Sequence, residues 1–421
     1  MKSRLARKLT ALDATILGLG SMIGAGIFVV AGPGADAAGS GLIIAVLLAG
    51  GIAFLNAMAM AQLAVLYPES GGTYVYGRKQ LSPYWGFLAG WGFVIGKIAS
   101  CAAMALTFAF YLNEEHARGL AVVTVLLLTG VNFLGIRKTV LATKIFLLIA
   151  LLALITVGFS AAMGGAMDVQ RLSQWTARGG VAGILQATGL VFFAFAGYAR
   201  IATLGEEVIA PQKNIPRAIF WALGLTVIIY SLLISATLMT VDLSTLVQSK
   251  TPLLEVLRSS GFERLSVIVR MGAIFAALGV LLSLLAGVGR TVFAMAAAGD
   301  LPNSLSRVHP VRRVPHIAEL SVGFVVAVLV SVADIRSVIG FSSFAILIYY
   351  AIANFAAFTL GPNERRWPRW TSLLGFVLCL ATAGSLPVSS LLGGAFLFIA
   401  ASGIYWLRLK IKGKAELDRP L

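Results

Sequence analysis

The chain has 421 residues, of which 59% are hydrophobic and only 12% are charged. Soluble globular chains carry roughly 25% charged residues, so this composition excludes a soluble protein and indicates several membrane-spanning helices. The two cysteines and three histidines lie far apart along the chain, and they indicate neither a disulfide framework nor a metal site.

Apolar runs long enough to cross a membrane recur along the whole sequence. Twelve such runs are predicted, at residues 12–34, 41–66, 84–112, 119–135, 140–163, 182–209, 217–241, 266–298, 317–333, 336–360, 370–385 and 388–408. The segments between them are short and leave no soluble domain. The sequence therefore predicts an all-α integral membrane protein with about twelve transmembrane helices.

The placement of lysine and arginine predicts the orientation. With a cytoplasmic amino terminus, 21 of these residues fall in cytoplasmic segments and seven in outer loops. This bias follows the positive-inside rule and predicts a multi-pass protein of the cell (plasma or inner) membrane, with both termini cytoplasmic. The net charge of +16 then reflects orientation and attraction to anionic lipid. The lipid bilayer is an expected partner, and nucleic acid is not.

The first run contains the stretch GLGSMIGAGIF, with glycines at positions 18, 20, 24 and 26. Each glycine costs roughly 1 kcal/mol of helix propensity relative to alanine. One interpretation is close packing, because small residues four apart let helix backbones touch in a bilayer. The other is a deliberate interruption that frees main-chain groups for a ligand. This segment alone leaves both open.

A second interrupted run supports the ligand interpretation. The stretch GLVFFAFAGYARIATLGEE, residues 189–207, again carries small residues inside an apolar span. If spans one to five and six to ten are two repeats, the interrupted spans occupy corresponding positions, which points to a binding site at the membrane midplane. Unwinding at 22–26 and 193–197 would free amides to bind a carboxylate and carbonyls to bind an ammonium group.

These stretches resemble the amino acid–polyamine–organocation (APC) transporters. The resemblance also rests on YPESGGTYVYGRKQLSPYWGFLAGW (67–91), FFAFAGYARIATLGEEVIAPQKNIPRAI (192–219) and AMAAAGDLP (294–302). It implies a LeuT-type 5+5 inverted repeat with helices 1 and 6 unwound. Residues 1–165 would form the first five-helix repeat, 166–360 the second, inverted repeat, and 361–421 helices 11 and 12 with a cytoplasmic carboxyl terminus.

The resemblance implies a secondary active amino acid permease that works by alternating access, as a monomer or a homodimer, and not an enzyme. The amides of Ala25 and Gly26 would then meet the substrate carboxylate, and Phe193 would cover the substrate from outside. The carbonyls of Met22, Phe193, Ala194 and Ala196 would meet the substrate ammonium group. The whole predicted substrate site comprises Met22, Ile23, Gly24, Ala25, Gly26, Phe193, Ala194, Ala196 and Gly197.

The sequence departs from the family pattern at two positions. Relatives that handle basic amino acids or polyamines often place a glutamate two residues after the glycine that corresponds to Gly197, where this chain has Ala199. Many relatives also carry a lysine well inside the fifth helix, near the position of Ala150. Here Lys144 lies nearer the end of that helix, where its side chain can snorkel.

Lys97 lies instead in the middle of the third run, 13 residues from Tyr84 and 15 from Leu112, and thus roughly 20 Å from either end. Two interpretations are open. The ammonium group could be a structural prop bonded to freed carbonyls, or it could line the pathway and carry a proton. The 17 acidic residues all lie in loops or toward span ends, so no acidic partner is expected.

We therefore predict a proton-coupled transporter of neutral amino acids. An acidic amino acid transporter or an amino acid exchanger of the same fold is the alternative. Arg200 cannot release a proton, so it is expected to be solvated or paired with Glu207, or to contact an anionic substrate side chain. Lys97 and Arg200 are thus the candidate coupling and selectivity residues. No cofactor is expected, and the single hydroxyl of Ser283 does not support a sodium site.

The remaining polar residues of the spans are expected to form hydrogen bonds between helices rather than to bind substrate; they are Asn56, Gln62, Asn132 and Gln186. No paired histidine, cysteine or carboxylate arrangement indicates an enzyme. No repeated filter sequence or ring of charges indicates a channel.

Overall fold

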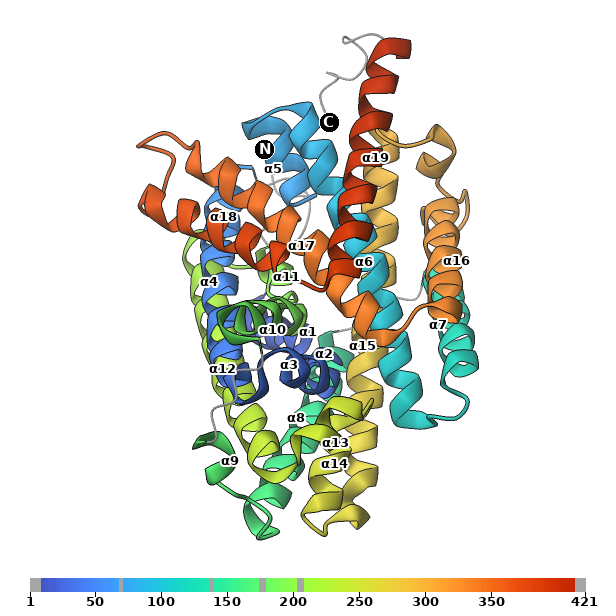
Figure 1. The fold of residues 1–421 in the computed structure, drawn as a ribbon. Helices are drawn as coiled ribbons and strands as arrows, with labels where there is room; N and C mark the ends of the chain where they lie inside the picture. The colour runs from blue at the N-terminus through green and yellow to red at the C-terminus, as the bar shows by residue number, and fades with distance from the viewer. Residues whose placement is uncertain (1–8, 68–70, 136–139, 174–178, 203–207, 413–421) are drawn as a thin grey trace.

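The computed structural model describes residues 9–67, 71–135, 140–173, 179–202 and 208–412. Figure 1 shows a bundle of helices with α5 (Thr73–Gln80) and the last turns of α19 (Val388–Lys412) at one end. At the opposite end lie α9 (Gln170–Ser173), α13 (Leu243–Gln248) and α14 (Pro252–Ser259). We refer to these as the α5 end and the α13 end.

The described residues are almost entirely helical. The first part of the chain forms α1 (Ala11–Met22), α2 (Gly26–Val29), α3 (Ala31–Ala38), α4 (Leu42–Leu66), α5, α6 (Pro83–Leu112), α7 (Ala117–Phe133), α8 (Val140–Met163) and α9. The second part forms α10 (Gly180–Phe195), α11 (Ala199–Ala202), α12 (Pro211–Thr240), α13, α14, α15 (Ser266–Ala297), α16 (His316–Val332), α17 (Ile335–Phe358), α18 (Arg369–Gly384) and α19. Short 3-10 turns occur at Gly39–Gly41, Glu263–Leu265 and Asn303–Ser306.

Each of the twelve predicted apolar runs contains helix in the described part of the chain. Eight segments there are long and apolar enough to cross a membrane: Ala11–Val29, Ala31–Leu66, Pro83–Leu112, Leu141–Met163, Pro211–Thr240, Glu263–Ala297, Ile335–Phe358 and Val388–Lys410. Four apolar helices are shorter, namely α7, α10, α16 and α18. The predicted all-helical membrane protein is confirmed.

The outer surface of the bundle carries many large apolar side chains. Leu148 is 68% exposed, Leu232 67%, Phe324 67% and Phe396 69%. A surface this apolar would be unfavourable in water, whereas it suits a hydrocarbon solvent. Helices are the structure expected there, because each satisfies its own main-chain hydrogen bonds.

The centre of the bundle is formed by α6, α15 and α17, because α6 packs against both of the other two helices. Most side chains of α6 and α17 are buried. A polar residue in the middle of α6, such as Lys97, therefore faces other helices rather than lipid.

A buried ionic cluster fixes α5 to the rest of the bundle. The Asp300 carboxylate accepts a hydrogen bond of 2.7 Å from the Tyr74 hydroxyl and pairs with Arg78 at 3.2 Å. Arg408 of α19 donates to the main-chain carbonyl of Asp300. Burial raises the pKa of the Asp300 carboxyl, and the hydrogen bond from Tyr74 and the charge of Arg78 oppose this rise. The cluster joins α5 to the segment after α15 and to α19.

Replacing Asp300 with alanine is expected to lower the free energy of unfolding by about 3 kcal/mol, because it removes an acceptor shared by two buried donors. Thermal unfolding of the purified protein in detergent measures the loss. Glu115→Ala, at an exposed position, is the control and should change stability by less than about 0.5 kcal/mol. Equal unfolding temperatures for the two variants would contradict a structural role for the cluster.

Candidate functional site

The first predicted interruption lies between α1 and α2. Helix α1 ends at Met22 and α2 begins at Gly26. The amide of Gly24 donates to the Met22 carbonyl at 2.7 Å, so a tight turn replaces the helical hydrogen bond. The prediction that this span is interrupted is confirmed.

The second interruption lies between α10 and α11. Helix α10 continues to Phe195 and α11 begins at Ala199, so the break spans residues 196–198. This is further along the chain than the predicted 193–197, because Phe193, Ala194 and Phe195 remain in the last turn of α10 and are buried there.

The two interruptions touch each other through main-chain atoms. A Cβ on Gly26 would lie 2.7 Å from the Cα of Ala194, and one on Gly197 would lie 2.1 Å from the carbonyl oxygen of Ser21. Only glycine permits such an approach of two backbones. The close-packing interpretation of the glycines is therefore confirmed, and the packing occurs where the helices are broken. The interpretation that the breaks free main-chain groups for a ligand stays a prediction.

Tyr230 of α12 links the two interruptions. Its buried hydroxyl donates to the Met22 carbonyl at 2.6 Å and lies 3.3 Å from the Ala194 carbonyl. Sequence reasoning missed this residue. The available signal was the one tyrosine of α12, in the middle of a membrane-spanning helix, since a buried tyrosine hydroxyl usually has a hydrogen-bond partner.

Main-chain groups at the interruptions differ in how many hydrogen bonds they already form within the protein. The amides of Ala25 and Gly26 donate to no main-chain carbonyl among the described residues. The Met22 carbonyl already accepts hydrogen bonds from the Gly24 amide and the Tyr230 hydroxyl, which use both of its lone pairs. The Phe193 carbonyl accepts from the Ala196 amide at 3.4 Å, and the Ala194 carbonyl accepts from the Tyr230 hydroxyl at 3.3 Å. Each therefore keeps one lone pair, whereas the Met22 carbonyl keeps none.

A cavity of about 320 Å³ opens at the interruptions. The predicted residues that line it are Met22, Gly24, Ala25, Gly26, Phe193, Ala194, Ala196, Gly197 and Lys97. Ile23 is buried and is not among the lining residues. The side chain of Arg200, and the whole of Glu207, lie outside the described part of the structure.

Side chains from five further helices complete the wall of the cavity. One face of α6 contributes Phe93, Lys97, Ser100 and Met104, and one face of α15 contributes Gly279, Val280, Ser283, Leu284 and Gly287. Other lining residues are Met60 of α4, Thr143 of α8 and Tyr349 of α17. The wall is thus largely apolar with a few hydroxyl groups, and the described residues that line it include no carboxylate.

The Lys97 side chain lies at the wall of the cavity and is 8% exposed. A structural prop would need a hydrogen bond from the ammonium group to a carbonyl. No residue in the described part of the structure hydrogen-bonds or ion-pairs with this group within the usual distances. One turn further along the helix, Ser100 bonds the Gly96 carbonyl and the Ser342 hydroxyl. The structural interpretation and the pathway interpretation of Lys97 both stay predictions.

Three of the four polar residues assigned to interhelical bonds behave as predicted. Asn56 accepts from Asn354 at 2.6 Å, Gln62 donates to Ser372 at 3.5 Å, and Asn132 donates to the Leu282 carbonyl at 3.3 Å. Gln186 lines a second pocket, between α3, the start of α10, the start of α17 and the turn that joins α18 to α19, and its interhelical bond stays a prediction.

A buried cavity at the meeting point of two broken helices, inside a bundle of membrane-spanning segments, defines a membrane transport protein. The sequence model of the amino acid permease family matches residues 13–412, and the chain belongs to this family of the APC superfamily. It is a transporter and not an enzyme.

The curated relatives support the same family. An uncharacterized transporter of Mycobacterium tuberculosis is 49% identical over 412 residues, which cover 98% of this chain and 93% of that protein. The branched-chain amino acid permease BcaP of Bacillus subtilis is 27% identical over 391 residues, which cover 87% of this chain and 83% of that protein. Cationic amino acid transporter 4 of Mus musculus is 30% identical over 383 residues, which cover 83% of this chain and 59% of that protein.

Gly26→Ala is expected to weaken amino acid binding at least about tenfold, because the new methyl group separates the two interruptions and displaces the amide of Gly26. Ligand-induced shifts in unfolding temperature measure the affinity. Gly158→Ala in α8 is the matched control, since a Cβ there meets nothing within 4 Å. An unchanged ligand-induced shift in Gly26→Ala would rule out the proposed role of this contact.

Proposed function

We propose that this protein is a secondary active transporter of neutral amino acids that is coupled to protons and works by alternating access. The observation that carries the proposal is the cavity at the two interruptions, which combines free main-chain amides, an apolar wall and one lysine. The name of the related branched-chain amino acid permease agrees with a neutral substrate.

The substrate would be held by its backbone groups. The amides of Ala25 and Gly26 bind the α-carboxylate, as expected at the amino end of a helix. The carbonyls of Phe193 and Ala194 accept from the α-ammonium group. The side chain of the substrate then faces the apolar wall formed by α6 and α15.

A cationic substrate side chain is disfavoured, although cationic amino acid transporter 4 is among the relatives. The described residues that line the cavity include no carboxylate to balance a second positive charge. Lys97, when protonated, repels such a side chain. An acidic amino acid substrate is the alternative, since an anionic side chain would be attracted to Lys97. Exchange of amino acids across the membrane is the alternative to symport.

The proposed architecture consists of twelve crossings arranged as two inverted five-helix repeats, residues 1–165 and 166–360, followed by residues 361–421. The α5 end is assigned to the cytoplasm, together with both termini. Described basic residues in the segments assigned to that side include Arg78, Lys79, Arg307, Arg312, Arg313, Arg365, Arg366, Arg369, Arg408 and Lys410. The protein would function as a monomer or a homodimer.

The cavity extends toward the proposed cytoplasmic side. Leu17 and Gly20 line it from α1, and Thr143 lines it from the first turn of α8. Beyond them, Lys144 pairs with Asp13 at 3.0 Å and joins α8 to α1. Opening to the cytoplasm would separate this partly exposed pair, which costs little because exposed ion pairs contribute about 0–1 kcal/mol.

Uptake into proteoliposomes tests the proposal. An imposed inward proton gradient should drive saturable accumulation of L-leucine or another neutral amino acid. Putrescine and agmatine should not compete, because they lack the carboxylate that the amides of Ala25 and Gly26 bind. Uptake of these amines in the absence of any amino acid transport would refute the proposed substrate class.

Lys97→Ala is expected to retain amino acid binding. Its initial rate of uptake driven by a pH gradient should fall at least about tenfold, because the variant lacks the group that would bind and release the proton. Lys97→Arg should also lose this uptake, since guanidinium stays charged. The measurement is initial uptake rate against external pH. Unchanged pH dependence in both variants would leave Lys97 as a structural residue.

A further inference from the structure

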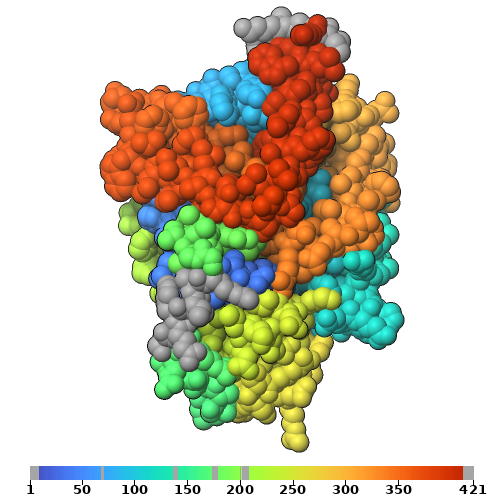
Figure 2. Space-filling view, viewed as in Figure 1, coloured from blue at the N-terminus to red at the C-terminus, as the bar shows by residue number. Residues whose placement is uncertain are grey.

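An apolar groove of about 560 Å³ lies on the membrane-facing surface of the bundle, where α6, α16, α17 and α19 meet. Figure 2 shows α16 (orange) and α19 (red) at the surface of the protein. One face of α16 forms a wall of the groove, because Phe324, Val328 and Val332 follow one another at intervals of four residues. These side chains are 67%, 49% and 71% exposed, so the groove is open to the hydrocarbon of the membrane. We refer to it as the α16 groove.

The α16 groove becomes polar at one end. Ser337, Ser389 and Ser390 line both this groove and the second pocket, of about 730 Å³, so the two spaces adjoin. The Ser390 side chain is 3% exposed, and its hydroxyl has no hydrogen-bond partner in the described part of the structure. A buried hydroxyl without a partner costs free energy, which a polar ligand at the junction of the two spaces would recover.

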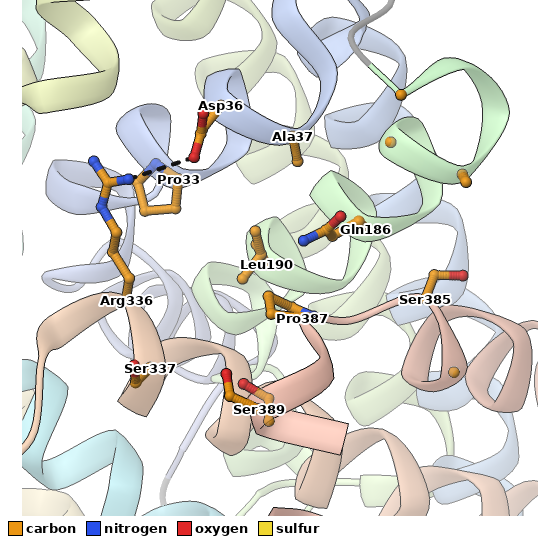
Figure 3. Close-up of a pocket in the computed structure, with 15 residues that line it drawn as sticks. Pro33, Asp36, Ala37, Gln186, Leu190, Arg336, Ser337, Ser385, Pro387 and Ser389 are labelled. Carbon is orange, nitrogen blue, oxygen red and sulfur yellow. Dashed lines mark ion pairs between the residues drawn. The ribbon is translucent and has the colours of Figure 1, made fainter. Parts of the chain in front are cut away.

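A guanidinium group lies in the second pocket, beyond the serines. Arg336 pairs with Asp36 at 3.5 Å, as the dashed line in Figure 3 marks, and donates to the Val247 carbonyl of α13. Its side chain is 38% exposed. Because a guanidinium group carries five N–H donors, these two contacts leave donors for an anion while the pair with Asp36 stays in place. Arginine is suited to a phosphate, which it binds through two parallel hydrogen bonds.

The depth of the α16 groove matches one leaflet of a bilayer. From Val332 to Phe324 of α16, and from Ser389 to Leu397 of α19, the groove follows eight residues, or about 12 Å at 1.5 Å per residue. Half of a hydrocarbon core is about 15 Å thick. The polar end lies toward α13, whereas the apolar end reaches Ile98, near the midpoint of α6. A chain that enters at the serines therefore ends near the middle of the membrane, as the acyl chains of lipids do.

We propose that the α16 groove and the adjoining part of the second pocket bind one phospholipid of the surrounding membrane. An acyl chain fills the groove, and the phosphate accepts hydrogen bonds from Arg336. The Ser390 hydroxyl donates to an ester oxygen of the lipid at the junction. The inference does not depend on the proposed function, because it needs only the membrane-embedded fold.

The bound lipid packs behind the wall of the cavity at the interruptions. On α6, Ile95, Ile98 and Ala99 line the α16 groove, whereas Phe93 and Lys97 line the cavity. At about 100° per residue, the two sets point to opposite sides of the helix. The lipid therefore supports α6 from the side opposite to Lys97, and its binding is expected to raise the unfolding temperature of the protein.

Native mass spectrometry of the purified protein, titrated with phosphatidylcholine, tests the apolar half of the site. In the wild type, one lipid should bind more tightly than any further ones. Val328→Trp, which fills the groove, should weaken this first binding at least about tenfold. Val123→Trp is the matched control, since Val123 is 53% exposed on α7 and does not line the groove, and it should bind as the wild type does.

Diacylglycerol with the same acyl chains tests the polar half, because it lacks the phosphate. Arg336→Gln should weaken the binding of phosphatidylcholine about tenfold and leave that of diacylglycerol unchanged, whereas a structural defect would weaken both. Arg336→Lys should restore part of the affinity for phosphatidylcholine. Arg258→Gln on α14, a matched loss of a half-exposed arginine in an ion pair, should change neither. Thermal unfolding establishes that each variant is folded.

A phosphatidylcholine with a photoreactive group at the end of one acyl chain locates the lipid. Cross-links are expected in the middle of α6, around Ile98, and on α16, around Phe324. Cross-links spread evenly over all lipid-facing helices would overturn the inference, as would equal first binding in the wild type and Val328→Trp. A dimer in detergent that Val328→Trp dissociates would show that a second copy of the chain covers the groove, and would overturn it too.

Discussion

Main-chain polar groups inside a membrane must find partners within the protein, and the rest of this structure depends on how two broken helices meet that constraint. The breaks after Met22 and after Phe195 free amides and carbonyls that an unbroken helix would satisfy. Some are satisfied locally, as when Tyr230 and Gly24 bond the Met22 carbonyl. Ala25 and Gly26, whose amides have no main-chain partner among the described residues, line the cavity. An amide left without a partner in such a place costs free energy that a bound acceptor would recover.

The sequence predicted the helices well because membrane spans are specified by length and hydropathy alone. All of the apolar runs contain helix, and the first interruption lies where glycines at positions 24 and 26 indicated it. The second interruption was predicted at residues 193–197, whereas the structure has it at residues 196–198. Ala194 and Phe195 have small or apolar side chains that suit both a helix and a break, and the packing of Phe193 and Phe195, which is a tertiary property, extends α10 to Phe195.

The residues of the candidate site were predicted from the resemblance of the two interrupted stretches to a known family, and not from local sequence alone. Periodicity within α6 places Phe93, Lys97, Ser100 and Met104 on one face, and the structure brings that face to the cavity. Tyr230 could not be linked to the interruptions, because its contacts cross about 200 residues of chain and depend on how α12 packs against α1. That Gln186 lines a second pocket could not be predicted either, since no single sequence shows which neighbours a helix face will have.

Tyr349 suggests how events in the cavity reach the α5 end. Its ring lines the cavity, and its hydroxyl accepts a hydrogen bond of 3.1 Å from the amide of Thr73, at the start of α5. From there Tyr74 and Arg78 connect α5 to Asp300, and Arg408 connects Asp300 to α19. A ligand that displaces the Tyr349 ring must also strain or break the bond to Thr73. Helix α5 is thus bonded to the wall of the cavity through Thr73 and to the segment after α15 through Tyr74 and Arg78.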